Sequence, residues 1–553
     1  MAATAVLAPM FFFGNISGHD FIFHVESWMD VAGQWREGIP FPRWAEWANW
    51  GFGEPRFVFY PPLSWLAGAA IGSVLPWRMA PGAYVWLVLI VAGMSMWRLA
   101  REWLRGPHAI IAAVLYALSP YQLVIVFYRS AFGELMAAAL LPLLVWAALR
   151  VIGGERRRIP ILALAFAGVW LANAPAAVIA TYSVALVILI GCVWRRSFWP
   201  AISGAIAMAA GFGLAAFYIV PATWEQKWVQ IAQIVSQNLV PSANFLFTRS
   251  NEPDFVAFNR KVSWVAVGLI VANLIAALTT LKKRREIAGP WWPFAALAII
   301  STGMMLPPSL WLWRELPKLW FIQFPWRWLD VLGLAFAFFV ALLIANLPNR
   351  AAAWIAAAVI LAGICAAGVA MVREAPWDSS DLANIAHQIQ SGRGYEGTDE
   401  YAPIGCDRYQ FPGNPGDSER PEDVSPEPAP RIAKLDPNSD EIVPATGVRL
   451  HTQLWTSERR EFTAESTEAV TLAVRLVNYP AWTVQVNGHD ARFDLRAETQ
   501  QILVPLPAGD NRVDLRFRRT PDRALGSAIS ALSGAALCAF AWVSRKRRSR
   551  VGA

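Results

Sequence analysis

The feature of this sequence that most constrains its fold is a series of apolar runs, most of them roughly 17–22 residues long. A run of about 20 apolar residues crosses the hydrocarbon core of a bilayer as an α-helix. The composition agrees, because 56% of the residues are hydrophobic and 16% are charged, whereas soluble domains average about 45–50% and about 25%. These values exclude a soluble enzyme, a fibrous protein and a disordered chain. The runs predict membrane-spanning helices at residues 82–98, 108–127, 131–150, 159–173, 176–194, 198–220, 262–281, 291–308, 326–346, 351–371 and 524–543.

The positive charges indicate how these helices are oriented. The net charge of +8 could suggest a nucleic-acid partner, but the basic residues gather in short links between apolar runs. Such links remain in the cytoplasm, and all of them fall on one side if each run crosses once. We therefore predict a multi-pass protein of a bacterial inner (plasma) membrane with cytoplasmic N- and C-termini and no nucleic-acid partner. The links are Arg98, Arg101 and Arg105; Arg156, Arg157 and Arg158; Arg195 and Arg196; Lys282, Lys283, Arg284 and Arg285; Arg350; and residues 545–550.

The same topology places the remaining segments outside the cell membrane. Residues 1–371 would form the membrane domain, with a first outer loop at residues 15–81. Residues 1–13 are too short to cross the bilayer and are expected to be the end of a first membrane helix. Residues Pro62–Val74 are short and flanked by prolines, so we expect an interfacial helix on the outer surface.

The C-terminal part of the outer region changes character along the chain. Residues 372–445 are rich in Pro, Asp, Ser, Glu and Gly, which predicts a mostly irregular linker. From residue 446 the apolar residues alternate with polar ones, as in antiparallel strands, and Asn487-Gly488 fits a two-residue hairpin turn. We expect an extracytoplasmic β-sandwich of about seven strands at residues 446–522. A final membrane helix and a basic cytoplasmic tail follow at residues 523–553.

The first outer loop contains the first candidate site. Asp20 and His24 are four residues apart and share a face if this stretch is helical. A carboxylate and an imidazole together could bind a divalent metal or transfer a proton, and His19 lies beside them. The alternative is a helix N-terminus with Asp20 near the positive end of the dipole. Many aromatic residues, Tyr60 among them, crowd this loop; they suit sugar stacking, but membrane-interface residues are the favoured interpretation.

Two further candidate sites lie where apolar runs begin or end. Arg129 and Glu134 are charges at a membrane boundary, which are costly and suggest either a functional site or a mutual ion pair. Arg327, in the stretch after Gln323, suits a phosphate or pyrophosphate. The alternatives for Arg327 are an interaction with lipid headgroups or an ion pair with Asp330. No nucleotide-binding loop or nucleophile elbow is present, so ATP-driven transport is not indicated.

Several segments are similar to a known family. HDFIFH, FPRW, GFGEPRFVFYPPL, YRSAFGELMAAALLPLL and QFPWRWLDVLGLAF resemble bacterial membrane proteins labelled 6-pyruvoyl-tetrahydropterin-synthase-related. That label does not imply pterin chemistry here, because no zinc-binding synthase pattern is present. The tail segments NYPAWTVQVNGHDARFDL and VPLPAGDNRVDLRF are similar to the outer β-domain of YfhO-like proteins. The layout as a whole resembles the glycosyltransferase C superfamily: a mainly α polytopic protein of about 11–12 membrane helices, with the outer β-sandwich before the last one.

The resemblance implies an activity and roles for residues. It implies transfer of a sugar from a polyprenyl-phosphate donor to an envelope glycan, lipid or protein on the outer face of the membrane. Asp20 matches the acidic position that acts as base or metal ligand, Glu134 the acid of the second loop, and Arg327 suits the leaving phosphate. Two other readings stay open: a non-catalytic protein of envelope or polysaccharide assembly, and a lipid or glycan transporter. The expected substrate-binding residues are His19, His24, Arg129, Tyr60, Gln323 and Arg327, and the metal, if any, would lie at Asp20 and His24.

Overall fold

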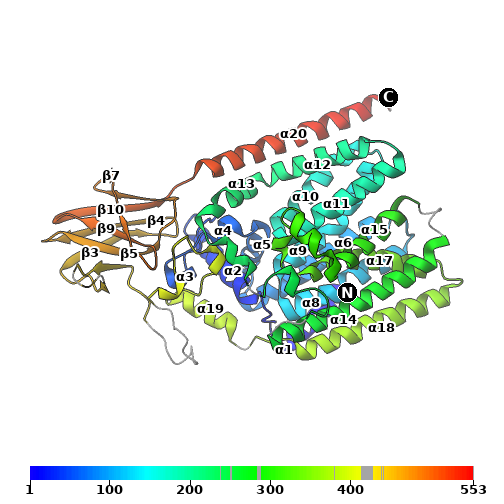
Figure 1. The fold of residues 1–553 in the computed structure, drawn as a ribbon, viewed down its shortest axis with the longest axis horizontal. Coiled ribbons are helices and arrows are strands. Elements are labelled where there is room, and N and C mark those ends of the chain that lie inside the picture. Colours follow the sequence, from blue (N-terminus) through cyan, green and yellow to red (C-terminus); the bar gives the residue numbers. More distant parts are fainter. Residues whose placement is uncertain are drawn as a thin grey trace.

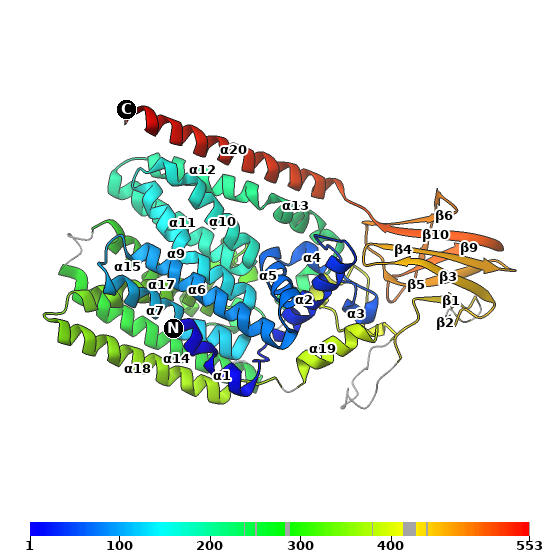
Figure 2. The same ribbon diagram turned by 180° about the vertical axis from the view of Figure 1, so that it is seen from behind.

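The computed structural model describes residues 1–236, 238–248, 252–282, 288–378, 380–412, 427–437, 439 and 441–551. A bundle of helices forms one end of the molecule and a β-sandwich forms the other, with shorter helices between them (Figure 1). The long final helix, α20 (Pro521–Val551), leaves the sandwich and runs back along the bundle. Seen from behind, α18 (Arg350–Glu374) and α20 lie on opposite sides of the bundle (Figure 2).

Within the described residues, eight helices are long and apolar enough to cross a membrane. Two further pairs pass the same test but are bent, by 74° and by 93°, which gives up to ten spans. The eight are Trp77–Ala100, Pro107–Arg129, Phe132–Ile152, Ala174–Arg195, Pro253–Thr280, Pro325–Ala345, Arg350–Glu374 and Pro521–Ser544. The bent pairs are Trp199–Leu214 with Ala216–Trp228, and Pro290–Met304 with Pro307–Glu315.

This count is lower than the 11–12 spans expected from the sequence, for local reasons. The run at 159–173 forms a helix of only 14 residues, which ends where Asn173 leaves the helical conformation. The run at 291–308 breaks at Pro307 and Pro308, which lack the N–H that a continuing helix needs. The first run forms a helix of 12 residues. The helices of the bundle are α1 (Ala2–Phe13), α6 (Ala80–Ala100), α7 (Pro107–Ala117), α8 (Pro120–Val124), α9 (Phe132–Ile152), α10 (Ile159–Ala172), α11 (Ala174–Arg195), α12 (Trp199–Leu214), α13 (Ala216–Trp224), α14 (Pro253–Thr280), α15 (Ala288–Met304), α16 (Leu310–Glu315), α17 (Leu329–Ala345) and α18.

The basic links meet at the end of the bundle that is far from the sandwich. Arg195 Nη2 donates to the carbonyl oxygen of Gly153 at 2.6 Å, and the guanidinium of Arg156 lies 4.6 Å from the ring centroid of Trp199. Arg150 Nη1 lies 3.0 Å from Glu102 Oε2. The links after α6, α9 and α11 therefore lie side by side, as the charge pattern predicts. Residues 283–285 and the side chains of residues 545–550 lie outside the described part of the chain.

Short helices fill the space between the bundle and the sandwich. They belong to residues 15–81, the predicted first outer loop, and comprise α2 (Phe21–Arg36), α3 (Ala48–Gly51), α4 (Arg56–Phe59) and α5 (Pro62–Val74). The segment predicted to be an irregular linker also contains a helix, α19 (Asp381–Gln390). It packs on the first outer loop, where Tyr395 Oη donates to Asp30 Oδ2 at 2.9 Å. The composition of this segment does not predict its ordered structure, because the contacts that fix the segment come from residues about 350 positions away in the sequence.

The β-sandwich consists of two five-stranded sheets with the strand orders β2-β1-β5-β9-β8 and β3-β4-β10-β6-β7. Asn487 and Gly488 have φ values of 52° and 83° between β6 and β7, as the type I′ hairpin turn requires. There are more strands than the seven expected, because three of them are only two residues long and too short to show alternation. The strands are β1 (Ile432–Leu435), β2 (Ile442–Val443), β3 (Val448–Trp455), β4 (Arg459–Ser466), β5 (Val470–Val477), β6 (Trp482–Val486), β7 (His489–Asp490), β8 (Asp494–Leu495), β9 (Gln501–Leu506) and β10 (Gly509–Phe517).

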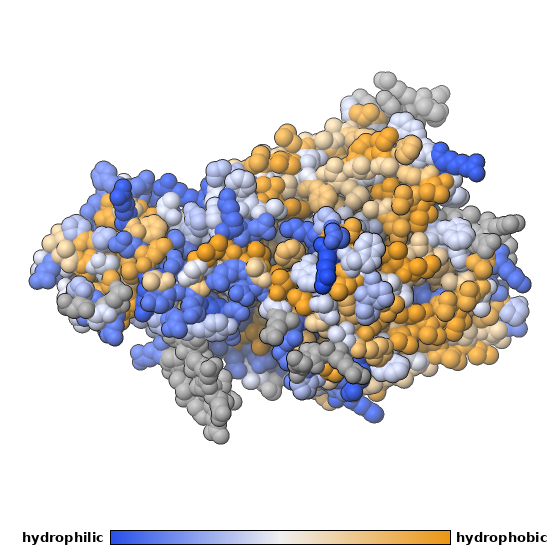
Figure 3. All heavy atoms as spheres, viewed as in Figure 1, coloured by the Kyte–Doolittle hydropathy of each residue, from blue (hydrophilic) through white to orange (hydrophobic). Residues whose placement is uncertain are grey.

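Buried polar contacts fix the sandwich to the rest of the molecule. Arg523, in the first turn of α20, donates from Nε and Nη2 to the two carboxylate oxygens of Glu225, each at 2.7 Å. Tyr479 donates to Glu225 Oε2 at 2.5 Å, and Ser457 donates to Gln34 Oε1 at 2.8 Å. Figure 3 shows hydrophobic residues over the helical body and hydrophilic residues over the sandwich, on the face drawn there. The surface therefore divides into a part suited to lipid and a part suited to water.

Candidate functional site

The candidate site is built where the start of α2 meets the turn before α9. Asp20 precedes α2, and its backbone N–H donates to the carbonyl oxygen of Arg129 at 2.8 Å. Gly18 N–H donates to Ser130 Oγ at 3.1 Å. A β-carbon at Gly18 would lie 2.6 Å from the carbonyl carbon of Arg129, so that only glycine fits there. The two segments, more than 100 residues apart in the sequence, are thus held in direct backbone contact.

A turn of π-helix presents Arg129 to the site. The span that begins with α7 ends in η2 (Ile125–Arg129), which is π-helical, and Ser130 follows with a φ of 50°. The Ala131 N–H donates to the carbonyl oxygen of Ile125 at 3.3 Å and closes this wide turn. π-Helical turns are rare and occur frequently at functional sites. Here the turn ends at Arg129, shortly before Glu134 in the first turn of α9, so that the two side chains meet.

Glu134 is buried and shared by three partners. Its Oε2 lies 2.6 Å from Arg129 Nη1 and 3.2 Å from Arg327 Nε. Its Oε1 accepts a hydrogen bond from the Tyr121 hydroxyl at 2.5 Å. Glu134 is only 1% exposed. A buried carboxylate of this kind persists because its charge is paired and hydrogen-bonded. The ion pair between Arg129 and Glu134 that the sequence suggested therefore exists, and Arg327 joins it.

Asp20 differs from Glu134 in being accessible. Its side chain is 40% exposed, and Oδ2 lies 3.4 Å from Arg129 Nη2. The other oxygen, Oδ1, has no hydrogen-bond partner among the described residues. Asp20 is thus the carboxylate of the cluster that can contact a reactant, whereas Glu134 is occupied by its partners.

Arg327 enters the cluster from η10 (Pro325–Trp328), immediately before α17. Its Nη1 donates to the carbonyl oxygen of Ile322 at 2.8 Å, and in the described part of the chain its Nη2 makes no hydrogen bond. Gln323 has a φ of 67° and donates to the carbonyl oxygen of Ile234 at 2.6 Å. Gln323 therefore holds the loop after α13 in place. Since Nη2 of Arg327 makes no hydrogen bond with the described residues, this side of the guanidinium is available to an anion.

The other candidate residues lie around this cluster. His24 is 1% exposed and lies 5.2 Å from the ring of Phe132 and 5.7 Å from that of Tyr60, measured between centroids. Burial lowers the pKa of His24 to about 4, so this imidazole is neutral at pH 7. Burial, followed by the charge of Arg129, also lowers the pKa of His19. Burial raises the pKa of the Tyr60 hydroxyl. Tyr60 lies close to the start of α9. A β-carbon added at Gly133 would lie 3.0 Å from the hydroxyl oxygen of Tyr60.

The residues do not form a ready metal site. Within the described ranges, no group of three His, Cys, Asp or Glu side chains comes together to hold a metal ion. His24 is enclosed by aromatic rings, whereas Asp20 is exposed. The two residues expected to bind a metal, Asp20 and His24, therefore lie in different surroundings, which does not fit a shared metal ion.

The structure explains why Asn173 interrupts an apolar run and excludes one alternative for Arg327. Asn173, which interrupts an apolar run, caps α11 by accepting the Ala176 N–H on Oδ1 at 2.9 Å. Asp330 does not pair with Arg327, contrary to one of the alternatives. Both of its carboxylate oxygens are buried without a hydrogen-bond partner among the described residues.

Sequence reasoning missed Tyr121 and the buried cluster around Arg56. Tyr121 lies in an apolar run, where nothing marks it as a partner of Glu134. Arg56 is fully buried, with Nε 2.6 Å from Glu54 Oε1 and Nη1 3.4 Å from Glu26 Oε2. Burial, opposed by Arg56, raises the pKa of Glu26 to about 8. The charged residues set among Gly, Pro and Phe in GFGEPRF were the available signal for this buried cluster.

An apolar groove has Trp328, the residue after Arg327, in its wall. Its volume is about 510 Å³. A larger groove, of about 910 Å³, lies elsewhere and is lined by none of the charged residues of the site. The groove beside Trp328 is lined by Tyr182, Ser183, Leu186, Ile299, Ile300, Gly303, Met304, Pro308, Ser309, Trp311, Leu312, Leu316, Leu319 and Trp328.

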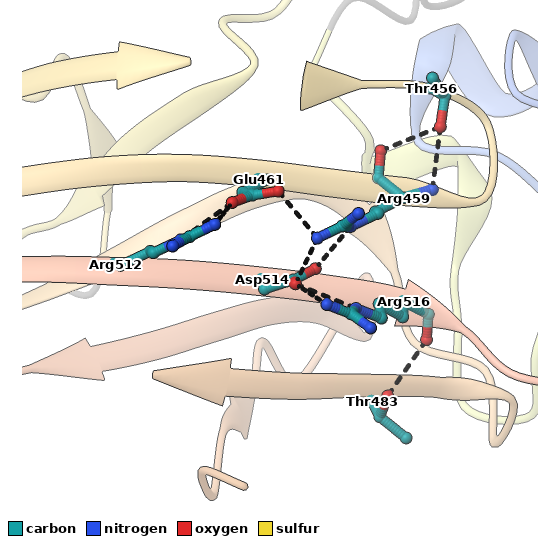
Figure 4. Close-up of polar contacts among 7 residues, drawn as sticks. All are labelled: Thr456, Arg459, Glu461, Thr483, Arg512, Asp514 and Arg516. Atoms are coloured by element: carbon teal, nitrogen blue, oxygen red, sulfur yellow. Dashed lines mark hydrogen bonds and ion pairs between the residues drawn. The ribbon is translucent and has the colours of Figure 1, made fainter. Parts of the chain in front are cut away.

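A second cluster of charges lies on the sandwich, on β4 and β10 (Figure 4). Asp514 Oδ2 lies 2.9 Å from Arg459 Nη2 and 2.5 Å from Arg516 Nη2. Glu461 Oε2 lies 2.8 Å from Arg459 Nη2, and its Oε1 pairs with Arg512. Each acid thus pairs with one arginine of its own strand and one of the neighbouring strand. This cluster links neighbouring strands and leaves neither acid without an arginine partner, so it is not a candidate catalytic site.

Comparison with solved structures gives matches of low TM-score. The arabinofuranosyltransferase AftD from Mycobacteria has 18% identity and a TM-score of 0.39, over 68% of this chain and 26% of its own. The arabinosyltransferase EmbB from Mycobacterium smegmatis has 14% identity and a TM-score of 0.36, over 94% of this chain and 63% of its own. ArnT from Cupriavidus metallidurans, bound to undecaprenyl phosphate, has 13% identity and a TM-score of 0.27, over 71% of this chain and 88% of its own. The chain thus spans about a quarter of the length of AftD.

Comparison of sequences gives a clearer result. No protein of curated function matches the chain. The model of the 6-pyruvoyl-tetrahydropterin synthase related domain, described as a membrane protein, matches residues 57–372, which is more than half of the chain. These residues include Glu134 and Arg327. The resemblance of the sequence to this family is therefore confirmed: the chain belongs to the family of 6-pyruvoyl-tetrahydropterin synthase related membrane proteins.

Proposed function

We propose that this protein is a membrane glycosyltransferase that moves a sugar from a polyprenyl-phosphate donor to an acceptor on the outer face of the membrane. The observation that supports this most is the arrangement around Asp20. An accessible carboxylate lies 3.4 Å from Arg129 Nη2, and Arg129 and Arg327 both contact the buried Glu134. A base for an acceptor and a cation for a leaving phosphate thus belong to one cluster.

The orientation in the membrane is part of the proposal. The basic links lie at the end of the bundle opposite to the sandwich (Figure 1), and positive links favour the cytoplasmic side. The charged cluster lies toward the other end, beside the first outer loop. On this proposal the site, residues 15–81 and the sandwich face outward, and both termini are cytoplasmic. A donor carried by a membrane lipid suits such a site, because nucleotide-linked sugars are made inside the cell.

The proposed chemistry assigns one task to each charged group. Asp20 takes the proton of the acceptor hydroxyl, whose oxygen forms a bond to the anomeric carbon of the sugar. The bond between that carbon and the phosphate oxygen breaks, and the phosphate leaves with the electron pair. The free side of the Arg327 guanidinium stabilises the charge of the leaving phosphate. Glu134 and Arg129 are positioning residues, because they hold Arg327 and Asp20 without being exposed themselves.

The groove beside Trp328 supports a lipid-linked donor. It has a volume of about 510 Å³ and is lined almost entirely by apolar side chains of α11, α15 and α16. Arg327 precedes Trp328 in the same short helix. A polyprenyl chain in this groove would place its phosphate close to the guanidinium.

The arrangement favours the transferase over the two other functions considered. A transporter requires charged residues along a path through the membrane, whereas Asp20, Glu134 and Arg327 are joined in a single cluster through contacts of 3.4 Å or less. A non-catalytic assembly protein would tolerate substitution of Asp20, since Asp20 makes one long ion pair.

The test is transfer of labelled sugar from a panel of polyprenyl-phosphate donors by the full-length protein in lipid. We expect transfer by the wild type and loss of transfer in Asp20→Asn. Asp254→Asn is the matched control, because Asp254 is an exposed acid in the first turn of α14. An Asp20→Asn protein with wild-type transfer would overturn the role of Asp20. Absence of transfer by a folded wild type from every donor of the panel would count against the transferase and favour the assembly protein.

A further inference from the structure

A further buried acid, Asp330, lies near the proposed site and takes no part in its ion pairs. Asp330 is in the first turn of α17, three residues after Arg327. It is 5% exposed, and neither carboxylate oxygen has a hydrogen-bond partner in the described part of the chain. The nearest acid to Arg327 Nε is instead Glu134, whose Oε2 lies 3.2 Å away. An isolated buried carboxylate is strongly unfavourable in its charged form.

Asp330 lines a small cavity between helices. The cavity offers about 10 Å³ to the centre of a water molecule, close to the roughly 10–15 Å³ that one buried water needs. Apart from Asp330, its wall consists of apolar side chains. A metal ion would find too few oxygen ligands among these side chains, whereas a proton on the carboxyl group needs none. The other lining residues are Ala137, Ala138, Leu141, Val169, Ala176, Ile179, Ala180 and Val331.

The charges around Asp330 are already balanced without it. Two arginines, Arg129 and Arg327, face two acids, Asp20 and Glu134. An ionised Asp330 would add a third negative charge in a region of low dielectric. The helices α10 and α11 bring only apolar residues to the cavity. The titratable and charged groups that face Asp330 from the elements packed around it are Tyr116 of α7, Tyr121 of α8, Arg129 of η2, Glu134 of α9 and Arg327 of η10.

We propose that Asp330 is a proton-binding site that controls anion binding at Arg327. With the proton bound, Asp330 is neutral, holds one water molecule in the cavity, and leaves the free side of Arg327 to a phosphate. When the proton passes to water, the remaining carboxylate competes for Arg327 and repels the phosphate. The identity of the anion, a lipid-linked phosphate, rests on the proposed function; the proton site itself does not.

The first test detects the proton directly. Infrared difference spectra of the full-length protein in lipid, wild type minus Asp330→Asn, report the C=O stretch of a protonated carboxyl group. Subtraction removes the contribution of other buried acids, such as Glu26. We expect the carboxylic-acid band of Asp330 at pH 7 and its disappearance at higher pH. A difference spectrum that shows only an ionised carboxylate at pH 7 would overturn the proposal.

The second test measures the coupling to the anion. Binding of undecaprenyl phosphate to the protein in nanodiscs is followed from pH 7 to pH 10. By Coulomb's law, a unit charge at a separation on the order of 10 Å and an effective dielectric constant of about 20 changes the affinity for an anion on the order of tenfold or more. We expect the wild-type affinity to fall by about that factor as Asp330 loses its proton. The affinity of Asp330→Asn should stay constant over the same range.

Matched variants make the outcome unambiguous. Asp330→Leu also lacks a titratable group and should show the same constant affinity, which covers the case in which Asp330→Asn does not fold. Asp254→Asn should keep the pH profile of the wild type. Equal profiles for the wild type and both Asp330 variants would overturn the coupling. If none of the proteins binds undecaprenyl phosphate at any pH, the lipid-linked donor is wrong and the coupling falls with it, while the infrared band still decides the proton site.

Discussion

Replacing Glu134 by glutamine is expected to destabilise the membrane domain strongly. The substitution preserves the shape of the side chain but removes its negative charge. Arg129 and Arg327 would then remain buried, at 3% and 9% side-chain exposure, without the carboxylate that both of them contact. The loss thus comes mainly from the two arginine charges that the substitution leaves unpaired.

The magnitude follows from the cost of an uncompensated buried charge. Breaking a buried ion pair by removing one partner costs about 3–5 kcal/mol. The hydrogen bond from Tyr121 also loses its charged acceptor, but the contributions of one network do not add. We therefore expect the free energy of unfolding to fall by about 3–5 kcal/mol in total. A double variant, Glu134→Gln with Arg129→Gln, should lose less than the sum of the two single variants.

Equilibrium unfolding in bicelles measures this loss, and the chain offers a matched control. Glu155 also contacts three arginines, Arg150, Arg157 and Arg158, but its side chain is 25% exposed. Exposed ion pairs contribute about 0–1 kcal/mol each, so Glu155→Gln should have little effect. Similar losses for Glu134→Gln and Glu155→Gln would refute the reasoning, because burial would then make no difference.

Four other substitutions have distinct expected outcomes. Asp20→Asn should abolish sugar transfer while changing the free energy of unfolding by no more than about 1 kcal/mol, since its ion pair is long and exposed; a large loss of stability would show a structural role instead. Tyr121→Phe should cost about 1.5–3 kcal/mol of unfolding free energy, because its hydroxyl donates to a charged acceptor, and a cost near zero would contradict that contact. Asp330→Leu should raise the unfolding free energy by about 1–3 kcal/mol, because no group of the described residues pairs with this buried carboxyl and one water satisfies it only in part; a decrease would mean that the contact with water stabilises the fold. Burial raises the pKa of Glu26 from 4.5 to about 8, so the folded state binds the proton more tightly and stability should fall between about pH 4.5 and pH 8; Glu26→Gln should remove that decline, and an unchanged pH profile would contradict the shift.

Much of the fold follows from local patterns that a single segment carries by itself. The length of an apolar run fixes whether a helix can span the bilayer, and eight of the predicted runs form such helices. Asn487-Gly488 fixes its turn through the positive φ values that both residues adopt. The bends at Ala215 and Pro307 were less visible, because a hydropathy average over about 20 residues does not register a break within the run.

The site was only partly predictable, because its geometry depends on contacts between distant segments. Three separate signals identified Asp20 by its spacing to His24, Glu134 by its charge at a membrane boundary, and Arg327 by its suitability for a phosphate. The sequence suggested the ion pair between Arg129 and Glu134, but nothing in it shows that Arg129 also contacts Asp20, which is 109 residues away. Nor does the sequence show that Glu134 is enclosed while Asp20 stays exposed. The groove beside Trp328 cannot be predicted from the sequence for the same reason, because segments from α11 to η10 form its walls.

The most direct measurement of the central claim is a structure of the Asp20→Asn protein in lipid with a polyprenyl-phosphate sugar bound. The account predicts the phosphate within hydrogen-bond distance of Arg327 and the polyprenyl chain in the groove lined by Trp328. It also predicts that the anomeric carbon faces residue 20. A phosphate bound away from Arg327, or a sugar that does not face residue 20, would contradict the account.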